Sequence, residues 1–493
     1  MSTPRSSTLD TGTDRLSRSA WGMLLVLCGA LFLDALDVSM TGVALPSIGA
    51  DLHMSTSALQ WVVSGYVLGY GGFLLLGGRA ADLLGRRRVF LIALAVFVVA
   101  SGLGGLATDG SLLIVTRFIK GMAAAFTAPA GLSIITTTFA EGRARNKALS
   151  IYSATGAAGF SLGLVFSGLL TELGWRWVFF FPVPVTLLVL AAAVKLVPDS
   201  GRSANSRRGF DAAGAASVTA AMLLLVFTVV EAPEAGWGSV RTVSSLVATA
   251  AILALFVAIE RRTPAPLIRL GILRSGALIR ANLGAMSLIG AWFGCQFIAV
   301  LYMQQVRGWS PLEAGLAIFP AGLLVTTIAP RVEPLVTRFG TSKVILAGLV
   351  SSAAAYALFL GIAPHSNYWT GLLPTFVLAG TAFGLAYGPL NIAATNGVAA
   401  EEQGLAGGIV NTSFQFGGAV VLAAVTAVND AAGSAGSPQG MLDGFHAAVV
   451  VSLIVAVIGA GVTATGLLKR RRPIVLDRES EPEPELVGAG APR

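Results

Sequence analysis

Four ionisable side chains lie inside long apolar stretches of the sequence: Asp34 and Asp37 in one stretch, and Arg117 and Lys120 in another. A charge at the centre of a membrane helix costs about 2.5–3.5 kcal/mol, so such a residue indicates a functional site. Each pair is spaced i, i+3, which places both members on one face of a helix. A buried carboxylate beside a cation can bind a proton or a cationic substrate, which is the chemistry of a coupled transporter.

Depth in the membrane predicts how these charges pair. With a rise of about 1.5 Å per residue, a first helix that runs outward from the cytoplasm places Asp34 about 20 Å and Asp37 about 24 Å into a core about 30 Å thick. A fourth helix that runs inward places Arg117 about 8 Å and Lys120 about 12 Å below the outer surface. We therefore expect two ion pairs, Asp37 with Arg117 and Asp34 with Lys120, that line a water-filled cavity. A purely architectural ion-pair network is the alternative.

Composition indicates a membrane protein. Of the 493 residues, 55% are hydrophobic and only 12% are charged, whereas a soluble domain has about 25% charged residues. The net charge of +8 does not indicate a nucleic-acid partner, because the basic residues separate apolar runs and form no single patch. Both cysteines, Cys28 and Cys295, lie in apolar runs, so we expect neither a disulfide framework nor a metal site.

Hydropathy predicts fourteen membrane-spanning helices, since each span needs about 20 apolar residues. An even number of spans places both termini on the same side of the membrane. The predicted spans lie at residues 21-45, 59-78, 89-107, 112-137, 148-170, 177-197, 212-230, 242-259, 281-303, 312-330, 344-363, 370-392, 404-428 and 445-468.

The loop charges predict the orientation. Connections that hold few basic residues, Arg176, Arg241 and Arg307, alternate with connections that are rich in them. Basic loops face the cytoplasm, so both termini are expected there. The basic clusters are Arg79, Arg86, Arg87 and Arg88; Arg143, Arg145 and Lys147; Arg202, Arg207 and Arg208; Arg261, Arg262, Arg269 and Arg274; Arg331, Arg338 and Lys343; and Lys469, Arg470, Arg471 and Arg472.

A weak internal repeat suggests how the spans are grouped. GRRRVFL from Gly85 and GTSKVIL from Gly340 both place a glycine and a basic residue before an apolar helix. If span two corresponds to span ten, two six-helix halves flank two additional helices. The expected regions are a cytoplasmic N-terminal tail (1-20), an N-terminal six-helix bundle (21-197), a linker with two additional helices (198-280), a C-terminal six-helix bundle (281-468) and a cytoplasmic disordered tail (469-493).

Several segments resemble motifs of the major facilitator superfamily, in its fourteen-span drug:proton antiporter branch. The resemblance covers about residues 21-470 and implies an all-α integral membrane protein with the major facilitator fold. Its segments are LDVSMTGVALP (36–46), GRAADLLGRRR (78–88), RFIKG (117–121), WRWVFFFPVP (175–184), GWSPLEAGLAIFPAGL (308–323) and EEQGLAGGIVNTSFQFGGA (401–419).

The sequence departs from the family pattern at the charged positions. Lys120 stands where the family has glutamine, and the position of Asp34 is usually uncharged. These two changes are complementary in charge, which favours a second buried pair special to this protein. In the fifth-span antiporter motif, which reads GLVFSG from Gly163 to Gly168, Leu164 replaces a proline and Ser167 replaces a glycine.

The resemblance also implies a gating loop between spans two and three, which latches the two halves together on the inner side. Topology anchoring by its basic residues is the alternative. The loop residues are Gly78, Asp82, Gly85, Arg86 and Arg87. In the fifth span, glycines at helical spacing predict close helix packing; the candidates are Gly159, Gly163 and Gly168.

Polar and aromatic residues inside the spans are candidates for the substrate cavity, with interhelical hydrogen bonding as the alternative role. Glu231 is instead expected at the outer end of span seven, exposed to solvent. The candidate cavity residues are Trp61, Tyr66, Gln296, Asn391, Asn411 and Gln415.

These observations favour a secondary transporter that exports drugs, antibiotics or similar lipophilic molecules across the bacterial cytoplasmic membrane, since apolar cavity walls suit such substrates. The proton gradient is the expected energy source, with no cofactor and no metal, and the expected partners are a lipophilic small molecule and the bilayer, with a monomeric chain. Export of a specific metabolite or amino acid is an alternative. A non-transporting sensor or a membrane redox subunit is another, although His53, His365 and His446 all lie in or beside predicted outer loops and no nucleotide-binding loop occurs, so we expect no enzyme.

Overall fold

The computed structural model describes residues 17–139, 143–198, 212–263, 271, 275–396, 398, 403–433 and 437–468. All regular secondary structure in these ranges is helical. The C-terminal tail predicted at 469-493, most of the N-terminal tail and most of the linker lie outside them.

The first bundle is built from helices that pair in space out of chain order. α2 packs against α4, α1 packs against α5, and α3 contacts both α4 and α7. Its helices are α1 (Arg18–Leu52), α2 (Thr56–Leu84), α3 (Arg86–Gly105), α4 (Gly110–Thr138), α5 (Arg143–Leu173), α6 (Trp177–Phe180) and α7 (Pro182–Leu196).

The second bundle repeats this kind of packing: α10 contacts α15 and α16, and α13 contacts α14 and α16. Its α-helices are α10 (Gly276–Leu301), α11 (Pro311–Ile328), α12 (Val332–Phe339), α13 (Thr341–Phe359), α14 (Leu373–Thr395), α15 (Gln403–Ala432) and α16 (Pro438–Leu468). Short turns of other helical types join them: η3 (Tyr302–Val306), η4 (Ala329–Arg331) and η5 (Tyr368–Leu372).

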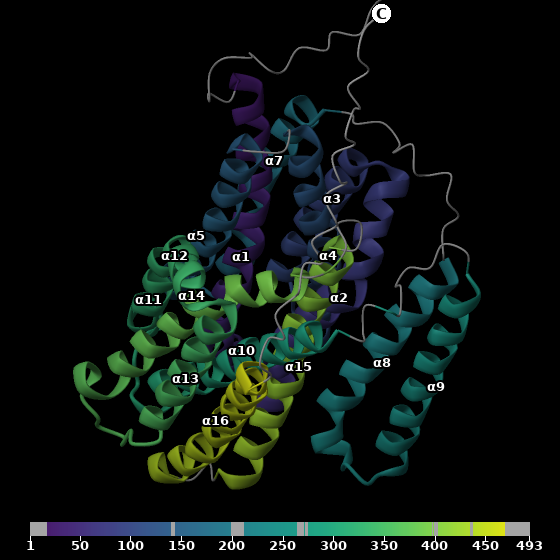
Figure 1. The fold of residues 1–493 in the computed structure, drawn as a ribbon. Helices are drawn as coiled ribbons and strands as arrows, with labels where there is room; N and C mark the ends of the chain where they lie inside the picture. Colours follow the sequence, from purple (N-terminus) through teal and green to yellow (C-terminus); the bar gives the residue numbers. More distant parts are fainter. Residues whose placement is uncertain are drawn as a thin grey trace, which may run out of the picture.

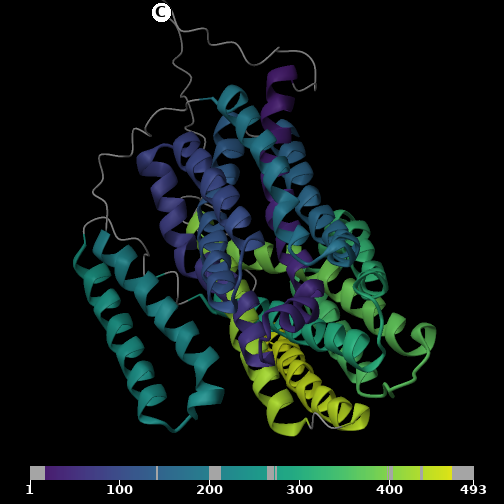
Figure 2. The same ribbon diagram turned by 180° about the vertical axis from the view of Figure 1, so that it is seen from behind.

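α8 (Ala212–Ala235) and α9 (Val240–Arg262) form a helical hairpin between the two bundles in the chain. Figures 1 and 2 both show this hairpin at one flank of the molecule. α8 packs against α2 of the first bundle and α15 of the second. α8 therefore covers the line along which α2 and α15 meet, and α9 packs against α8.

Polar caps at the helix starts explain where several helices begin. The side chains of Ser17, Ser55 and Ser275 each accept a hydrogen bond from the backbone N–H three residues later. At α11, Ser310 and Glu313 form a reciprocal capping box. These bonds satisfy backbone donors that have no partner within the helix.

Gly85 and Gly340 occupy corresponding positions in the two bundles. Gly85 precedes α3 with φ 96° and ψ 125°, and Gly340 precedes α13 with φ 86° and ψ 148°. Positive φ at these values is strained for any residue with a Cβ. The geometry accounts for the shared glycine in the two repeat segments that the sequence suggested.

A helix lies at each predicted span, but not every one meets a strict criterion for crossing a membrane. Within the described ranges, twelve helical segments are long and apolar enough to span a bilayer. α2 and α8, which correspond to the other two predicted spans, have 29 and 24 residues, and the apolar run of α8 is shorter, at Ala213–Val229. The all-α integral membrane fold is confirmed, while the count of fourteen crossings stays a prediction.

The bundles meet where α5 contacts α11 and α2 contacts α15. Glycines make the first contact close: a Cβ added to Gly168 would lie 2.5 Å from the Cα of Leu312, and one added to Gly315 would lie 2.3 Å from the carbonyl oxygen of Leu164. Such distances leave no room for a side chain, so the two backbones lie directly against each other.

Candidate functional site

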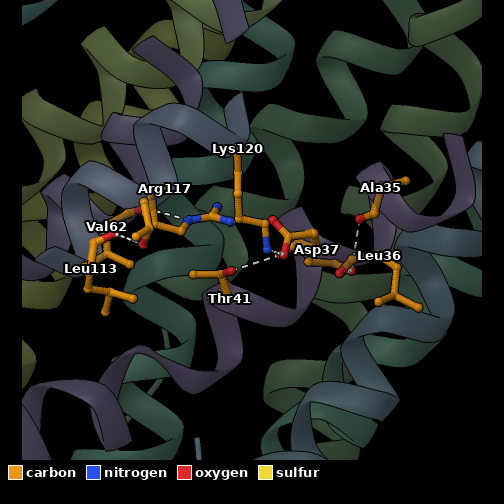
Figure 3. Close-up of polar contacts among 10 residues, drawn as sticks. Ala35, Leu36, Asp37, Thr41, Val62, Leu113, Arg117 and Lys120 are labelled. Carbon is orange, nitrogen blue, oxygen red and sulfur yellow. Dashed lines mark hydrogen bonds and ion pairs between the residues drawn. The ribbon is translucent and has the colours of Figure 1, made fainter. Parts of the chain in front are cut away.

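Asp37 of α1 is held by two cations of α4. Arg117 Nη1 donates to Oδ2 of Asp37, and Lys120 Nζ donates to Oδ1 (Figure 3). The Asp37 and Lys120 side chains are fully buried, and that of Arg117 is 2% exposed. Both oxygens of one carboxylate are therefore bound by positive groups inside the first bundle.

Aromatic rings and a backbone carbonyl surround the two cations. Arg117 Nε donates to the carbonyl oxygen of Val62 at 3.0 Å, and its guanidinium carbon lies 4.6 Å from the ring centroid of Tyr66. Lys120 Nζ lies 4.7 Å from the ring centroid of Phe97 and 5.2 Å from that of Phe179. Ring faces attract cations and keep water away from them, so these groups stabilise the charges without solvent.

The expected pair between Asp34 and Lys120 is wrong, because the Lys120 ammonium group binds Asp37 instead. Asp34 is 9% exposed, and its Oδ2 is buried without a hydrogen-bond partner among the described residues. The position of a residue along its helix fixes only its depth in the membrane, and not the direction in which its side chain extends. A lysine side chain can span the roughly 5.4 Å of one helical turn, so Lys120 reaches the carboxylate that Arg117 also reaches.

The candidate packing glycines of α5 contact two different helices. A Cβ on Gly159 would lie 2.5 Å from the carbonyl oxygen of Phe32, and one on Gly163 would lie 2.0 Å from Oγ of Ser39. Both glycines thus press α5 against the part of α1 that carries the two aspartates, whereas Gly168 faces α11. Ser167, which replaces a family glycine, donates its hydroxyl to the carbonyl oxygen of Met40.

The gating-loop residues lie at the junction of α2 and α3. Gly78 is close to Pro129 of α4, since a Cβ there would be 3.8 Å from Cβ of the proline. Arg87 Nη2 donates to the carbonyl oxygen of Val194 in α7 at 2.6 Å, a contact within the first bundle. Arg86 begins α3. The side chain of Asp82 lies outside the described part of the chain, so its role in a latch stays a prediction.

Two of the candidate cavity residues line pockets between the bundles. Gln296 and Phe293 of α10 line one pocket with Val38, Gly42 and Val63 of the first bundle. Gln415 of α15 lines a second pocket with residues of α2 and α8. Both pockets are small and have mainly apolar walls.

Three other candidates have partners that fix their side chains. The amide groups of Asn391 and Asn411 donate to carbonyl oxygens of their own helices, those of Tyr387 at 2.9 Å and Gly407 at 2.8 Å. Tyr66 is buried beneath the Arg117 guanidinium. These contacts fit the alternative of structural hydrogen bonding for both asparagines.

Trp61 contacts the additional helices and not either of these pockets. Its indole N–H donates to Oε1 of Glu231 at 3.2 Å, and its ring lies 5.7 Å from that of Phe227. Glu231 also pairs with Arg241 of α9 at 3.2 Å. Glu231 lies near the end of α8, as expected, and its side chain is 24% exposed, but it also has two bonded partners that the sequence does not predict. Its side chain joins α2, α8 and α9, a relationship that no sequence spacing reveals.

The described residues contain no group of three or more His, Cys, Asp or Glu side chains that could hold a metal ion. What the site offers is a buried cluster of opposite charges in a helical bundle that contacts a second bundle through glycine-lined interfaces. This combination defines a multi-pass membrane transporter of two-bundle architecture.

Comparison with known proteins specifies the family. The sequence pattern of the Major Facilitator Superfamily matches residues 27–422, and the chain belongs to that superfamily. It is 35% identical over 457 residues to the puromycin resistance protein pur8 of Streptomyces alboniger, covering 89% of each chain. It is 37% identical over 460 residues to the cephamycin export protein CmcT of Amycolatopsis lactamdurans, covering 91% of this chain and 93% of that protein.

Solved structures support the same fold. The POT family transporter PepTSo aligns with a TM-score of 0.66 and 14% identity over 91% of this chain and 98% of that one. The xylose transporter XylE from E. coli, in a partially occluded inward-open conformation, aligns with a TM-score of 0.61 and 17% identity over 90% and 97% of the two chains. At this level of identity the comparison concerns the fold alone.

Proposed function

We propose that this protein exports lipophilic drugs or antibiotics from the bacterial cytoplasm in exchange for protons. The observation that carries the proposal is the buried cluster of Asp37, Arg117 and Lys120 in a chain that is more than one-third identical to antibiotic resistance and export proteins. Buried charges are costly in a membrane, and a carboxylate that exchanges a proton is a direct means of coupling.

The free energy available from the proton gradient is sufficient to drive export. One proton that moves down a membrane potential of about 100 mV releases about 2.3 kcal/mol. Since about 1.4 kcal/mol corresponds to a tenfold ratio, this energy can maintain a roughly 50-fold gradient of a neutral substrate. No cofactor is needed for such exchange, and the chain can act as a monomer.

In alternating access, contacts between the two bundles close the substrate path on one side of the membrane. Gln304 Nε2 donates to the carbonyl oxygen of Val43 at 2.9 Å, and Gly168 lies against Leu312. With both termini in the cytoplasm, these contacts lie toward the outer side of the membrane. Bundles that touch on the outer side can separate on the inner side, so this conformation suits loading from the cytoplasm.

Export of a specific metabolite or amino acid remains the nearest alternative, and a sensor that does not transport is a more distant one. A drug-susceptibility panel distinguishes drug export from these two alternatives. An efflux-deficient bacterial host that produces the wild type should tolerate at least one lipophilic antibiotic better than a host that produces Asp37→Asn at equal membrane level. Asp443→Asn is the matched control, because Asp443 is exposed at the start of α16. Equal protection by the Asp37 variant would refute the coupling role.

A further inference from the structure

Gln296 contributes the polar group of an otherwise apolar pocket between the two bundles. It lies on α10, and its amide nitrogen is 3.6 Å from the position that a Cβ on Gly42 of α1 would take. Among the described residues that line this pocket, Gln296 alone has a polar side chain, and none is ionisable. Ligand sites typically have apolar walls and a few polar groups that fix the orientation of the ligand, so Gln296 is a candidate for substrate recognition.

Trp292 adds a second hydrogen-bond donor one helical turn before Gln296. The spacing i, i+4 places both side chains on the same face of α10. Trp292 is 5% exposed, and its indole N–H has no hydrogen-bond partner among the residues that the structure describes. Its ring lies 6.3 Å from that of Phe160 of α5, which is part of the pocket wall. A buried donor without a partner costs free energy, and a ligand with an acceptor in this region would remove that cost.

A row of aromatic rings continues from Trp292 through the second bundle. The ring of Phe383 lies 6.1 Å from that of Trp292, and the ring of Tyr387 stacks on Phe383 at 5.1 Å with an interplanar angle of 11°. Phe414 of α15 stacks on Tyr387 at 4.7 Å. Tyr387 is 39% exposed, so the row joins an accessible ring to the buried pair on α10. Aromatic side chains favour offset stacking and edge contacts with other rings, which suits a planar aromatic ligand.

The pocket offers no charge to balance an ion. Val38 of α1 lines it, whereas Asp37, the preceding residue, has both oxygens bound by Arg117 and Lys120 of α4. An ion that enters apolar surroundings loses its hydration, and this loss is costly unless an opposite charge replaces it. The site therefore favours an uncharged ligand whose polar atoms are hydrogen-bond acceptors.

We propose that Trp292 and Gln296 determine substrate specificity by donating hydrogen bonds to carbonyl oxygens of an uncharged, planar aromatic molecule. The aromatic side chains beside this pair pack against the rings of that molecule. The pocket is small in this conformation, but it lies between the bundles and widens as they move apart. This inference rests on the proposed export function, since it names the class of molecule that is exported.

Two probes with the same ring skeleton test the inference. 2-Methylanthraquinone is uncharged and carries carbonyl oxygens, whereas 2-methylanthracene has none. Binding of each probe to the full-length purified protein is measured by equilibrium dialysis in a single detergent. The wild type should bind the quinone about tenfold more tightly than the hydrocarbon, because a site built to hydrogen-bond a ligand discriminates against the analogue that lacks the bonding group.

Substitutions at the two donors assign this preference to them. Gln296→Leu should remove most of the preference for the quinone, and Trp292→Phe, which keeps an aromatic ring, should reduce it several-fold. Neither substitution should change the affinity for the hydrocarbon. The matched controls are Gln439→Leu and Trp237→Phe, at an exposed glutamine of α16 and at a tryptophan that is 56% exposed; both should match the wild type.

Equal affinity of the wild type for the two probes would overturn the inference, as would a full preference for the quinone in Gln296→Leu. If Gln296→Leu is not monodisperse, Trp292→Phe decides the test, and an unchanged preference there would contradict the inference. A quinone preference that depends on Gln296, in a protein that exports no drug, would refute the proposed function and leave the binding site intact. Drug export by a wild-type protein that binds both probes equally would refute the binding site alone.

Discussion

Lys120 donates to the Oδ1 oxygen of Asp37, the oxygen that the arginine one helical turn earlier does not contact. A single carboxylate therefore balances only one of two buried positive charges. This arrangement ties α1 to α4 inside the first bundle. Asp34 Oδ2, by contrast, has no hydrogen-bond partner within the described ranges.

Lys120→Ala should destabilise the protein through loss of this bond. Removing one partner from a buried ion pair costs about 3–5 kcal/mol, here moderated because Arg117 still binds Asp37. Unfolding in mixed micelles measures the effect. Lys195→Ala is the control, since Lys195 is exposed near the end of α7 and should leave stability unchanged. Equal stability of both variants would show that the bond contributes little.

Gly163→Val should separate α5 from α1 and abolish export. Even a Cβ at this position would lie 2.0 Å from Oγ of Ser39 and 2.7 Å from the carbonyl oxygen of Leu36, so the helices must move apart beside Asp37. Gly102→Val on α3 is the matched control, because a Cβ there meets no atom within 4 Å. Drug resistance and thermal stability should both fall in the first variant only, and an active Gly163→Val protein would contradict the packing role.

Trp61→Phe and Glu231→Gln should show energetic coupling. The bond between the indole N–H and Oε1 of Glu231 involves a charged acceptor, for which about 1.5–3 kcal/mol is typical, and partial exposure lowers this figure. A double-mutant cycle on unfolding measures the coupling, with hydrogen exchange in α8 as a second readout. Trp237→Phe, at a tryptophan that is 56% exposed, should show none. Additive effects at Trp61 and Glu231 would exclude the link.

Gly85→Ala and Gly340→Ala should each lower stability by about 1–3 kcal/mol, the usual cost of a non-glycine residue at strained dihedral angles. Both positions have positive φ and open space around the missing Cβ, so the cost arises from the backbone and not from a clash. Gly238→Ala, which also meets open space but has no positive φ, should be neutral. Thermal unfolding of the three variants measures the difference.

The sequence predicts the helical fold well because hydropathy directly reports which segments can cross a membrane. Asp37 with Arg117 could also be predicted, since both are charges in apolar helices at matching depth. The partner of Lys120 could not, because depth does not specify the direction in which a flexible side chain extends. The link from Trp61 to Glu231 is likewise hidden, because it depends on how α8 packs against α2 and no sequence separation encodes that contact.

For the glycines of α5, too, the sequence predicts one feature and leaves another open. Spacing in α5 predicts a close helix contact but not which helix is contacted. In the structure Gly159 and Gly163 face α1, whereas Gly168, one further turn along, faces α11 of the other bundle. One helix thus connects the segment that carries the charges to the interface between the bundles.

Proton movement in proteoliposomes tests the central claim most directly. Purified protein is reconstituted with a pH-sensitive dye in the lumen, and an antibiotic selected by the susceptibility panel is added to one side. The account predicts that the drug gradient drives protons the opposite way in the wild type and in Asp443→Asn, but not in Asp37→Asn. Drug movement without any proton flux in the wild type, or equal flux in the Asp37 variant, would contradict it.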